Sequence, residues 1–272
     1  MTGSATKTRR PDESGGTASE SERRLDMTSV LMVLTGSNVW TMKDGTPHPT
    51  GFWAEEFVKP HQAFIAAGLE VTVATPRGVT PTVDPLSYSP AFNHNDPAIV
   101  ASYQAYLREQ EPILSAATPL DHVNPADVDI IFVVGGHGPM QDLAVDPNIG
   151  AILAEMLDAP SKIVAAVCHG PASFLSAHRP DGTWLFKGRK LTGFSNEEES
   201  QATFAGNAPW LLEDRLRLAG ATYEALPAWT PHVVVDGNLI TGQQNYSAEV
   251  TAKSVLEQLR TVTPSAVGAG QT

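Results

Sequence analysis

The stretch that decides the fold is KIVAAVCHGPASFL, residues 162–175. It contains a continuous apolar run at 163–167, which is typical of a strand buried on both faces of a parallel sheet. Cys168 follows at once, and Gly170 and Pro171 suit a tight turn into the first turn of a helix. This pattern predicts an α/β fold with Cys168 at the carboxyl end of a central strand.

The same alternation of strands and helices extends on both sides of this stretch. Strands are expected at 30–34, 71–74, 130–134 and 191–192, with a hairpin at 233–240, and helices at 56–67, 148–157, 171–177, 210–218 and 247–259. The sequence therefore predicts a mostly parallel sheet sandwiched by helices, the flavodoxin-like architecture. Residues 79–127, rich in Pro, Asp and Asn, break this alternation, and we expect them to form a cap insertion over the sheet.

Residues 28–262 are predicted to form one α/β domain. The first 26 residues hold five basic and five acidic side chains and few apolar ones, a composition typical of disorder. We therefore expect a disordered leader over residues 1–27, with Met27 as a candidate start, and a flexible tail over residues 263–272. No apolar run reaches about 18 residues, so we expect no membrane span and a cytoplasmic location.

Charge and cysteine content exclude several classes of protein. The 272 residues include 18 basic and 30 acidic side chains, for a net charge of −12, and one cysteine. The acidic excess argues against nucleic acid and against an anionic membrane surface as partners. The lone cysteine excludes an intramolecular disulfide framework and a Cys-based zinc cluster, and it is a normal count for a cysteine nucleophile.

Cys168 is the candidate nucleophile. The partial positive charge of a helix N-terminus favours thiolate over thiol, and a strand–Cys–helix turn is the cysteine counterpart of a nucleophile elbow. His169 follows directly and would move protons, since its unperturbed pKa lies near neutrality. The alternative is that Cys168 is a small buried hydrophobe, as free cysteines usually are.

The stretch AVCHGPASFL at 166–175 resembles the nucleophile turn of the ThiJ/PfpI superfamily, relatives of class I glutamine amidotransferases. Within it, the match is to the branch of heat-shock chaperones and glyoxalase III proteins. Four more stretches agree in order and spacing: TGFWAEEFVKP (50–60), VVGGHGPMQDL (133–143), LTGFSNEEE (191–199) and VVVDGNLITGQQNYSA (233–248). The resemblance covers about residues 29–260 and implies a class I glutamine amidotransferase-like fold.

The resemblance also implies which acids accompany the cysteine. Glu56, four residues before Pro60, matches the family glutamate that hydrogen-bonds the cysteine sulfur, and Glu55 is the competing assignment. Such a carboxyl would hold a proton toward the sulfur or take one from a substrate carbon.

A second acid would orient the imidazole of His169. Glu199 stands where relatives carry the acid of a Cys-His-acid triad, with Glu198 as the runner-up and Glu197 in the same run. The alternative for this run is a charged loop or a helix N-terminus.

The glycine-rich turn at 135–138 would supply an oxyanion hole. The resemblance implies that the backbone N–H of Gly136, together with that of His169, binds a developing negative charge. We expect neighbouring His137 to be structural. No metal and no cofactor are predicted, because His48, His61 and His94 each lack a close i, i+4 ligand partner.

The resemblance implies a cofactor-independent glyoxalase III type reaction on a small 2-oxoaldehyde, converting methylglyoxal to D-lactate or glyoxal to glycolate through a Cys168 hemithioacetal. The alternatives are a cysteine hydrolase (amidase, peptidase or protein deglycase) and a stress-response holdase chaperone. The sequence has no His-x-Glu pair, which argues against glutamine amidotransferase activity. A homodimer is expected from the relatives.

Overall fold

The computed structural model describes residues 28–262. The expected leader over residues 1–27, with its candidate start at Met27, and the expected tail over residues 263–272 lie outside the described residues. The strands are β1 (Ser29–Val33), β2 (Val39–Thr41), β3 (Pro47–Pro49), β4 (Glu70–Thr75), β5 (Thr118–Pro119), β6 (Ile130–Val133), β7 (Ile163–Val167), β8 (Lys190–Leu191), β9 (Thr222–Tyr223), β10 (Val233–Asp236) and β11 (Leu239–Gly242).

A seven-stranded sheet with the order β10-β11-β7-β6-β1-β4-β5 forms the centre of the molecule. Its neighbouring strands run parallel, except for the hairpin β10–β11. Strands β6 and β7 are buried along their whole length, as their apolar sequences require. Ala166 of β7 pairs with Val133 of β6 and with Thr241 of β11, so these three strands end level at one edge of the sheet.

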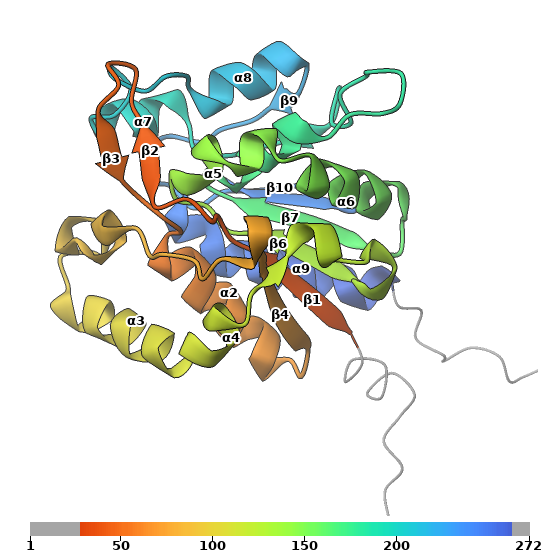
Figure 1. Ribbon diagram of the computed structural model, residues 1–272, viewed down its shortest axis with the longest axis horizontal. Helices are drawn as coiled ribbons and strands as arrows, with labels where there is room; N and C mark the ends of the chain where they lie inside the picture. The colour runs from red at the N-terminus through yellow and green to blue at the C-terminus, as the bar shows by residue number, and fades with distance from the viewer. Residues whose placement is uncertain (1–27, 263–272) are drawn as a thin grey trace, which may run out of the picture.

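Helices cover both faces of this sheet (Figure 1). The α-helices are α2 (Ala54–Ala66), α3 (Pro97–Glu109), α4 (Glu111–Ser115), α5 (Gly138–Gln141), α6 (Pro147–Asp158), α7 (Asn196–Gln201), α8 (Leu212–Ala219) and α9 (Ala248–Val262). The 3-10 helices are η1 (Pro76–Gly78), η2 (Pro85–Tyr88), η3 (Pro90–Phe92), η4 (Leu120–His122), η5 (Pro125–Asp127), η6 (Leu143–Val145), η7 (Gly170–Ser176) and η8 (Asn245–Ser247). α2 and α9 pack together on one face, and α6 and η7 pack together on the other.

The predicted α/β class, with a mostly parallel sheet between helices, is confirmed. The predicted strands and hairpin match β1, β4, β6, β7, β10 and β11. None of the helices within residues 28–262 has the length and hydropathy needed to cross a membrane.

The helix expected at 171–177 is present as η7, and it is a 3-10 helix. Ser173 Oγ donates to the carbonyl of Gly170 at 2.8 Å, and Ser176 Oγ donates to the carbonyl of Ser173 at 2.8 Å. These side-chain bonds to carbonyls three residues back support the tighter turn and compete with α-helical backbone bonds.

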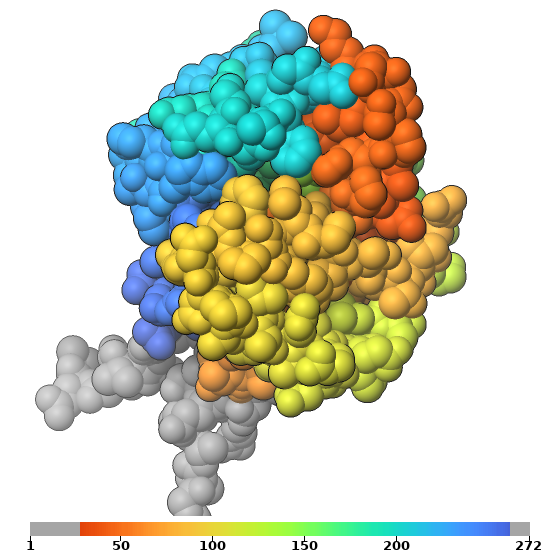
Figure 2. Space-filling view, turned by 90° about the vertical axis from the view of Figure 1, so that its left-hand side faces the viewer, coloured from red at the N-terminus to blue at the C-terminus, as the bar shows by residue number. Residues whose placement is uncertain are grey.

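In the structure, the first and later parts of the expected cap insertion, residues 79–127, contact different elements. Helices η2 and η3 bring Leu86 and Phe92 to the pocket described below, whereas α3 packs on α2 and β5 joins the sheet beside β4. Figure 2 shows the face on which this segment, in gold and yellow, meets the red-orange β2–β3 region and the cyan region near residue 200. The first part of the segment therefore covers the carboxyl edge of the sheet, and its last part extends the sheet.

Helix α6 packs closely on η7, the element that follows Cys168. This packing predicts that a substitution at Gly150 in α6 changes the stability of the protein. An added Cβ there would lie 2.4 Å from the backbone carbonyl oxygen of Ser176. We expect Gly150→Ala to lower the free energy of unfolding by roughly 1–3 kcal/mol, because this overlap outweighs the gain of about 1 kcal/mol in helix propensity. Urea unfolding monitored by circular dichroism measures the difference.

The matched control for this substitution is Gly206→Ala, where an added Cβ meets no atom within 4 Å. We expect its unfolding free energy to stay within about 0.5 kcal/mol of the wild type. A Gly150→Ala protein as stable as the Gly206→Ala protein would contradict the packing argument.

Candidate active site

Cys168 lies on a strained turn at the carboxyl end of β7. Its φ is +60°, a value that non-glycine residues rarely adopt and that concentrates at functional sites. Two backbone hydrogen bonds hold it there: its N–H donates to the carbonyl of Gly242 at 3.0 Å, and its carbonyl accepts the N–H of Phe194 at 2.9 Å. Gly170 allows the close return of the chain, since an added Cβ would lie 2.5 Å from the carbonyl oxygen of Val133.

The expected thiolate at Cys168 is wrong for the resting protein. Burial raises the pKa of the Cys168 thiol well above its usual value. The backbone N–H groups of Gly136 and His169 favour the thiolate but do not offset burial. The sulfur therefore keeps its proton at neutral pH until a group nearby accepts it.

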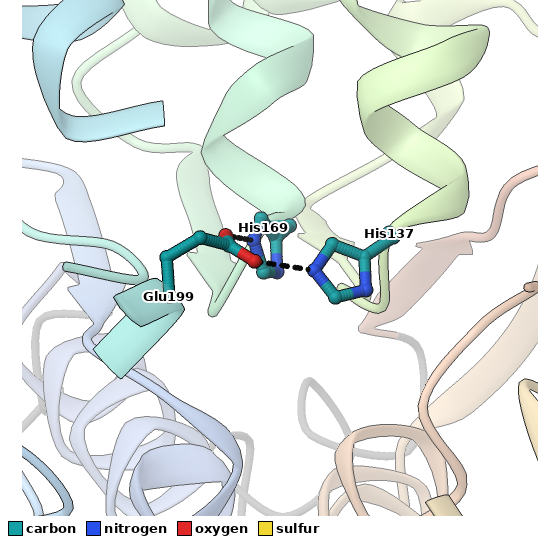
Figure 3. Close-up of side chains that lie close together, drawn as sticks. All are labelled: His137, His169 and Glu199. Carbon is teal, nitrogen blue, oxygen red and sulfur yellow. Dashed lines mark hydrogen bonds and ion pairs between the residues drawn. The ribbon is translucent and has the colours of Figure 1, made fainter. Parts of the chain in front are cut away.

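His169 provides that acceptor. Its Nδ1 lies 3.4 Å from Cys168 Sγ, and its Nε2 lies 2.8 Å from Glu199 Oε2 (Figure 3). Burial and the charge of His137 lower the pKa of His169 despite the opposing effect of Glu199, so the imidazole is neutral at neutral pH. If Nε2 carries the hydrogen donated to the carboxylate, Nδ1 has its lone pair free for the thiol proton.

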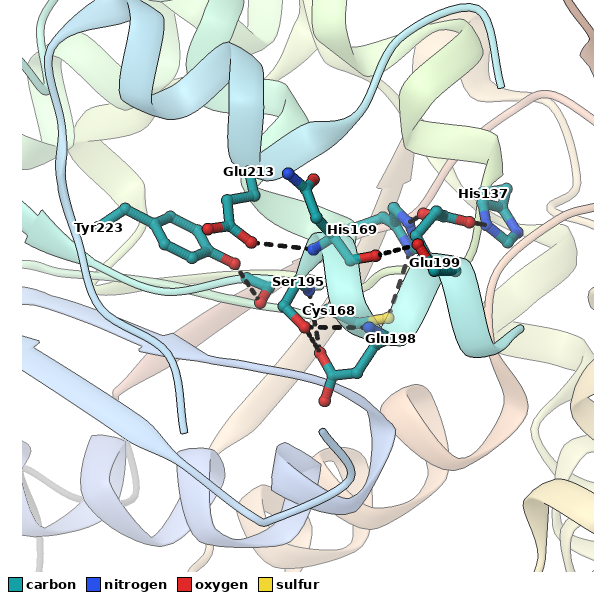
Figure 4. A network of polar contacts seen from close by, with 11 residues as sticks. His137, Cys168, His169, Ser195, Glu198, Glu199, Glu213 and Tyr223 are labelled. Carbon is teal, nitrogen blue, oxygen red and sulfur yellow. Dashed lines mark hydrogen bonds and ion pairs between the residues drawn. The ribbon is translucent and has the colours of Figure 1, made fainter. Parts of the chain in front are cut away.

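The structure distinguishes the three glutamates of the run that the sequence left open, and Figure 4 shows two of them, Glu198 and Glu199. Glu197 is exposed and accepts a hydrogen bond from Gln201. Glu198 forms a capping box with Ser195 at the start of α7. Glu199 alone of the three contacts His169, as the resemblance implied.

Glu56 faces the sulfur from the first turn of α2. Its Oε2 accepts the N–H of Gly135 at 2.8 Å, and its Oε1 has no well-aligned hydrogen bond within the described part of the chain. Burial raises the pKa of Glu56 well above its usual value, and the opposing interactions with Cys168 and Gly135 do not offset it. Glu56 therefore enters the site as a protonated carboxyl group.

Glu55 points to a different environment, which removes the competing assignment. Its Oε2 accepts a hydrogen bond from Asn245 Nδ2 at 2.8 Å. Asn245 lines the pocket above Cys168, a contribution that no sequence motif had indicated. Glu55 thus acts on the pocket wall through Asn245, and Glu56 acts on the sulfur.

The two glycines after β6 are required by their close contacts. An added Cβ at Gly135 would lie 2.6 Å from Glu56 Oε2, and one at Gly136 would lie 2.3 Å from the carbonyl oxygen of Gly51. Gly136 also has a φ of +95°, which favours glycine. The backbone N–H groups of Gly136 and His169 both act on Cys168 Sγ. The oxyanion hole expected from these two groups stays a prediction.

His137 reaches the same carboxylate as His169, which the sequence did not reveal. Its Nε2 lies 2.9 Å from Glu199 Oε1, and its ring stacks on Trp40 with centroids 4.6 Å apart. Burial lowers the pKa of His137, but the charge and hydrogen bond of Glu199 outweigh it and leave a net increase. A pair of imidazoles on one buried carboxylate is more than the structural role expected for His137.

The reactive groups lie at the base of a small pocket. Its floor includes Cys168, His169 and His137, and Cys168 is only 4% exposed. The remaining walls are mostly aromatic or aliphatic: Trp53, Leu86, Phe92, Phe194, Ala202, Phe204 and Trp229. No Lys or Arg lines this pocket among the described residues, so it suits a small neutral ligand.

Within residues 28–262, one group of His, Cys, Asp and Glu side chains brings three ligand atoms close together: His137, His169 and Glu199, within 4.8 Å. The Nε2 atom of each imidazole is already hydrogen-bonded to a different oxygen of Glu199. These potential metal ligands are therefore paired with one another. The expected absence of a metal and a cofactor stays a prediction.

Comparisons with curated proteins show which proteins this chain is similar to. The chain is 32% identical over 238 residues to Glyoxalase 3 of Candida albicans, a match that covers 85% of this chain and 98% of that protein. It is 28% identical over 237 residues to Glutathione-independent glyoxalase HSP31 of Saccharomyces cerevisiae, again covering 85% and 98% of the two chains.

The fold agrees as well. The crystal structure of glyoxalase III from Candida albicans matches with a TM-score of 0.71 at 28% identity, covering 86% of this chain and 98% of that one. Residues 49–258 match the DJ-1/PfpI family, and this range includes Glu56, Gly136, Cys168 and Glu199. The resemblance drawn from the sequence motifs is thereby confirmed, and the chain belongs to the DJ-1/PfpI family.

Proposed function

We propose that this protein is a cofactor-independent, glutathione-independent glyoxalase that converts a 2-oxoaldehyde, such as methylglyoxal or glyoxal, to a 2-hydroxy acid. The observation that carries the proposal is a buried thiol with a neutral imidazole nitrogen 3.4 Å away and a protonated carboxyl that also contacts it. The names of the matched Candida and Saccharomyces proteins support the same activity.

The first step is addition of Cys168 Sγ to the aldehyde carbon. The S–H proton passes to His169 Nδ1 as the C–S bond forms, and Glu199 stabilises the resulting imidazolium. The aldehyde oxygen gains negative charge near the N–H groups of Gly136 and His169, and then takes the proton back from His169. The product of this step is a hemithioacetal with no net change in protons.

The second step moves hydrogen between the two substrate carbons. The C1–H proton leaves to a base and the C2 ketone oxygen gains a proton, which gives an enediol. Reprotonation at C2 and loss of the C1 hydroxyl proton give a 2-hydroxy thioester. Glu56 and His169 both contact the sulfur and are the groups we assign to these transfers.

Hydrolysis completes the reaction. Water adds to the thioester carbon, the C–S bond breaks, and the 2-hydroxy acid leaves while Cys168 regains its proton. The oxidation of C1 balances the reduction of C2 within one substrate, so the reaction needs no external oxidant or reductant.

The shape of the pocket favours this reaction over the hydrolase alternative. Cys168 is 4% exposed at the base of a small pocket, and partly buried Leu86, Phe92 and Trp229 line it. An extended peptide or a side chain of a folded protein must displace these apolar side chains to reach the sulfur, whereas a three-carbon aldehyde needs little space. Amidase, peptidase and deglycase activities on proteins therefore fit the site less well.

Two further expectations from the sequence belong to this proposal. We propose a homodimer, which the family resemblance supports, and a cytoplasmic location. Light scattering of the purified protein tests the first, and microscopy of a tagged chain in its own cells tests the second.

The nucleophile assignment predicts the effect of Cys168→Ala. We expect this variant to lose glutathione-free consumption of methylglyoxal by about 10³-fold or more, because no other described thiol can form the hemithioacetal. The assay follows methylglyoxal loss and D-lactate formation together, with thermal unfolding as the check on folding. Equal rates for the two proteins would reject the proposal. Suppression of aggregation that survives the substitution would instead favour the holdase alternative.

Because Glu199 contacts His169 and Glu197 does not, the same substitution at the two positions should have different effects on kcat. We expect Glu199→Gln to lower kcat by about 10²–10⁴-fold, since the amide does not stabilise the imidazolium of His169. Glu197→Gln changes an exposed side chain in the same helix and should leave kcat unchanged. A Glu199→Gln enzyme with the kcat of the Glu197→Gln enzyme would contradict the assigned triad.

A further inference from the structure

Trp229 has an unusual backbone conformation beside the pocket. It lies in the loop between β9 and β10, and its φ is +66°, a value that bulky residues rarely adopt and that concentrates at functional sites. Its side chain lines the pocket above Cys168, whereas residues 224–227 and 230 of the same loop are exposed. A large apolar side chain in a strained conformation within an exposed loop needs an explanation that the triad does not supply.

Two hydrogen bonds from α7 hold Trp229 in place. Its backbone N–H donates to Glu198 Oε1 at 2.9 Å, and its indole Nε1 donates to Gln201 Oε1 at 2.6 Å. Glu198 and Gln201 are three residues apart, so they are neighbours on the surface of α7. Figure 4 shows that Glu198 and Glu199 leave this helix in different directions. One short helix thus carries the acid that contacts His169 and both anchors of Trp229.

The Glu198 carboxylate is itself fixed by further hydrogen bonds. It is fully buried, Oε1 also accepts Gln243 Nε2 at 3.0 Å, and Oε2 accepts the N–H and the hydroxyl of Ser195 at 2.9 and 2.8 Å. Gln243 in turn bonds the backbone N–H and carbonyl of Leu226, at 2.8 and 3.1 Å. The loop is therefore tied to buried side chains at both Leu226 and Trp229, and the strained conformation is held from several directions.

The indole packs among aromatic rings in the outer part of the pocket wall. Its ring centroid lies 5.9 Å from that of Phe92 in η3 and 5.8 Å from that of Phe194, and Phe194 packs on His169 with centroids 4.5 Å apart. Trp229 and Phe92 are partly exposed, whereas Cys168 and His169 are buried. Trp229 therefore stands between the reactive groups and the surface, one ring away from His169.

This position determines what the indole meets during the reaction proposed above. In the hemithioacetal, C1 of the 2-oxoaldehyde is bonded to Cys168 Sγ at the base of the pocket. C2 and its substituent then extend toward the outer part of the wall, where Trp229 lies. A hydrogen or a methyl group needs little space there, whereas a phenyl group needs the space that the indole occupies.

We propose that Trp229 is a specificity-determining residue that limits the size of the substituent on C2 of the 2-oxoaldehyde, and that Gln201 is a positioning residue that holds the indole in place. The identity of the substrate rests on the proposed function. The size limit does not, because it applies to any reagent that must pass Trp229 to reach Cys168 Sγ.

Removal of the indole should widen the range of substrates. In Trp229→Ala the bond to Glu198 is kept, because it uses the backbone N–H. We expect the ratio of kcat/KM for phenylglyoxal to kcat/KM for methylglyoxal to rise by about tenfold or more. Steady-state kinetics with the two aldehydes measures this ratio, and thermal unfolding checks that the variant is folded.

The matched control is Trp210→Ala. Trp210 is also a partly buried tryptophan, but it lines a separate groove with Leu218 and Arg215. We expect this variant to keep the wild-type ratio. A merely structural role for Trp229 predicts that Trp229→Ala changes thermal stability and leaves the ratio unchanged, and that result would overturn the proposal.

A second variant tests the position of the indole without removing it. Gln201 is exposed, so Gln201→Ala deletes the acceptor for Trp229 Nε1 at little cost to folding. We expect the same ratio to rise by about threefold, the effect of losing one ordinary hydrogen bond. Gln201→Glu keeps an acceptor oxygen and should keep the wild-type ratio. A wild-type ratio in Gln201→Ala would reject the positioning role.

Alkylation of the thiol separates the size limit from the proposed function. Cys168 is the sole cysteine of the chain, so its alkylation rate reports on this pocket alone. The probes are iodoacetamide and the bulkier 2-iodo-N-phenylacetamide, applied to the full chain and followed by mass spectrometry. We expect Trp229→Ala to raise the rate with the bulky reagent, relative to the small one, by about tenfold over the wild type, and Trp210→Ala to leave the relative rate unchanged.

The two readouts distinguish failure of the inference from failure of the proposed function. An unchanged relative alkylation rate in Trp229→Ala would overturn the size limit even in an active glyoxalase. The expected change in a protein that does not consume methylglyoxal would reject the proposed activity and still support Trp229 as the residue that limits access to Cys168.

Discussion

The buried carboxylate of Glu199 is the constraint around which the rest of the site is arranged. An ionised carboxyl that is 2% exposed needs partners on both oxygens, and His137 and His169 provide them at 2.9 and 2.8 Å. These partners come from the ends of β6 and β7, which are adjacent in the sheet. The helix α7 must in turn hold Glu199 over that edge, and the capping box between Ser195 and Glu198 fixes where α7 begins. Glu198, which precedes Glu199, thus helps to fix the position of the Glu199 carboxylate.

Much of this arrangement could be predicted from the sequence because its causes are local. The apolar runs of β6 and β7 identify strands buried on both faces, and level ends follow from parallel pairing. Cys168, His169 and Gly136 come directly after those strands, so their meeting at one edge was a consequence of the alternation of strands and helices. The spacing from Pro60 was enough to choose Glu56 over Glu55.

What the sequence did not show depends on contacts between distant segments. The second partner of Glu199 and the pocket wall at Asn245 arise where residues far apart in the chain meet, and no local spacing encodes them. The type of helix after Cys168 depends on serine hydroxyls that bond to carbonyls three residues back. The state of the thiol was misjudged for a similar reason: a helix N-terminus is visible in sequence, but the burial that outweighs it is not.

The raised pKa of Cys168 has a chemical consequence between turnovers. Peroxides and alkylating agents react with thiolates, so a buried thiol that keeps its proton is a poor target for either. The sole cysteine of the 272-residue chain has no second cysteine in the same chain with which a damaged sulfur could form a disulfide. Because the thiol proton leaves only toward His169 Nδ1, 3.4 Å away, the sulfur becomes reactive where a carbonyl carbon fits beside it. The burial that raises the pKa of the Cys168 thiol therefore also limits the access of oxidants to the sulfur.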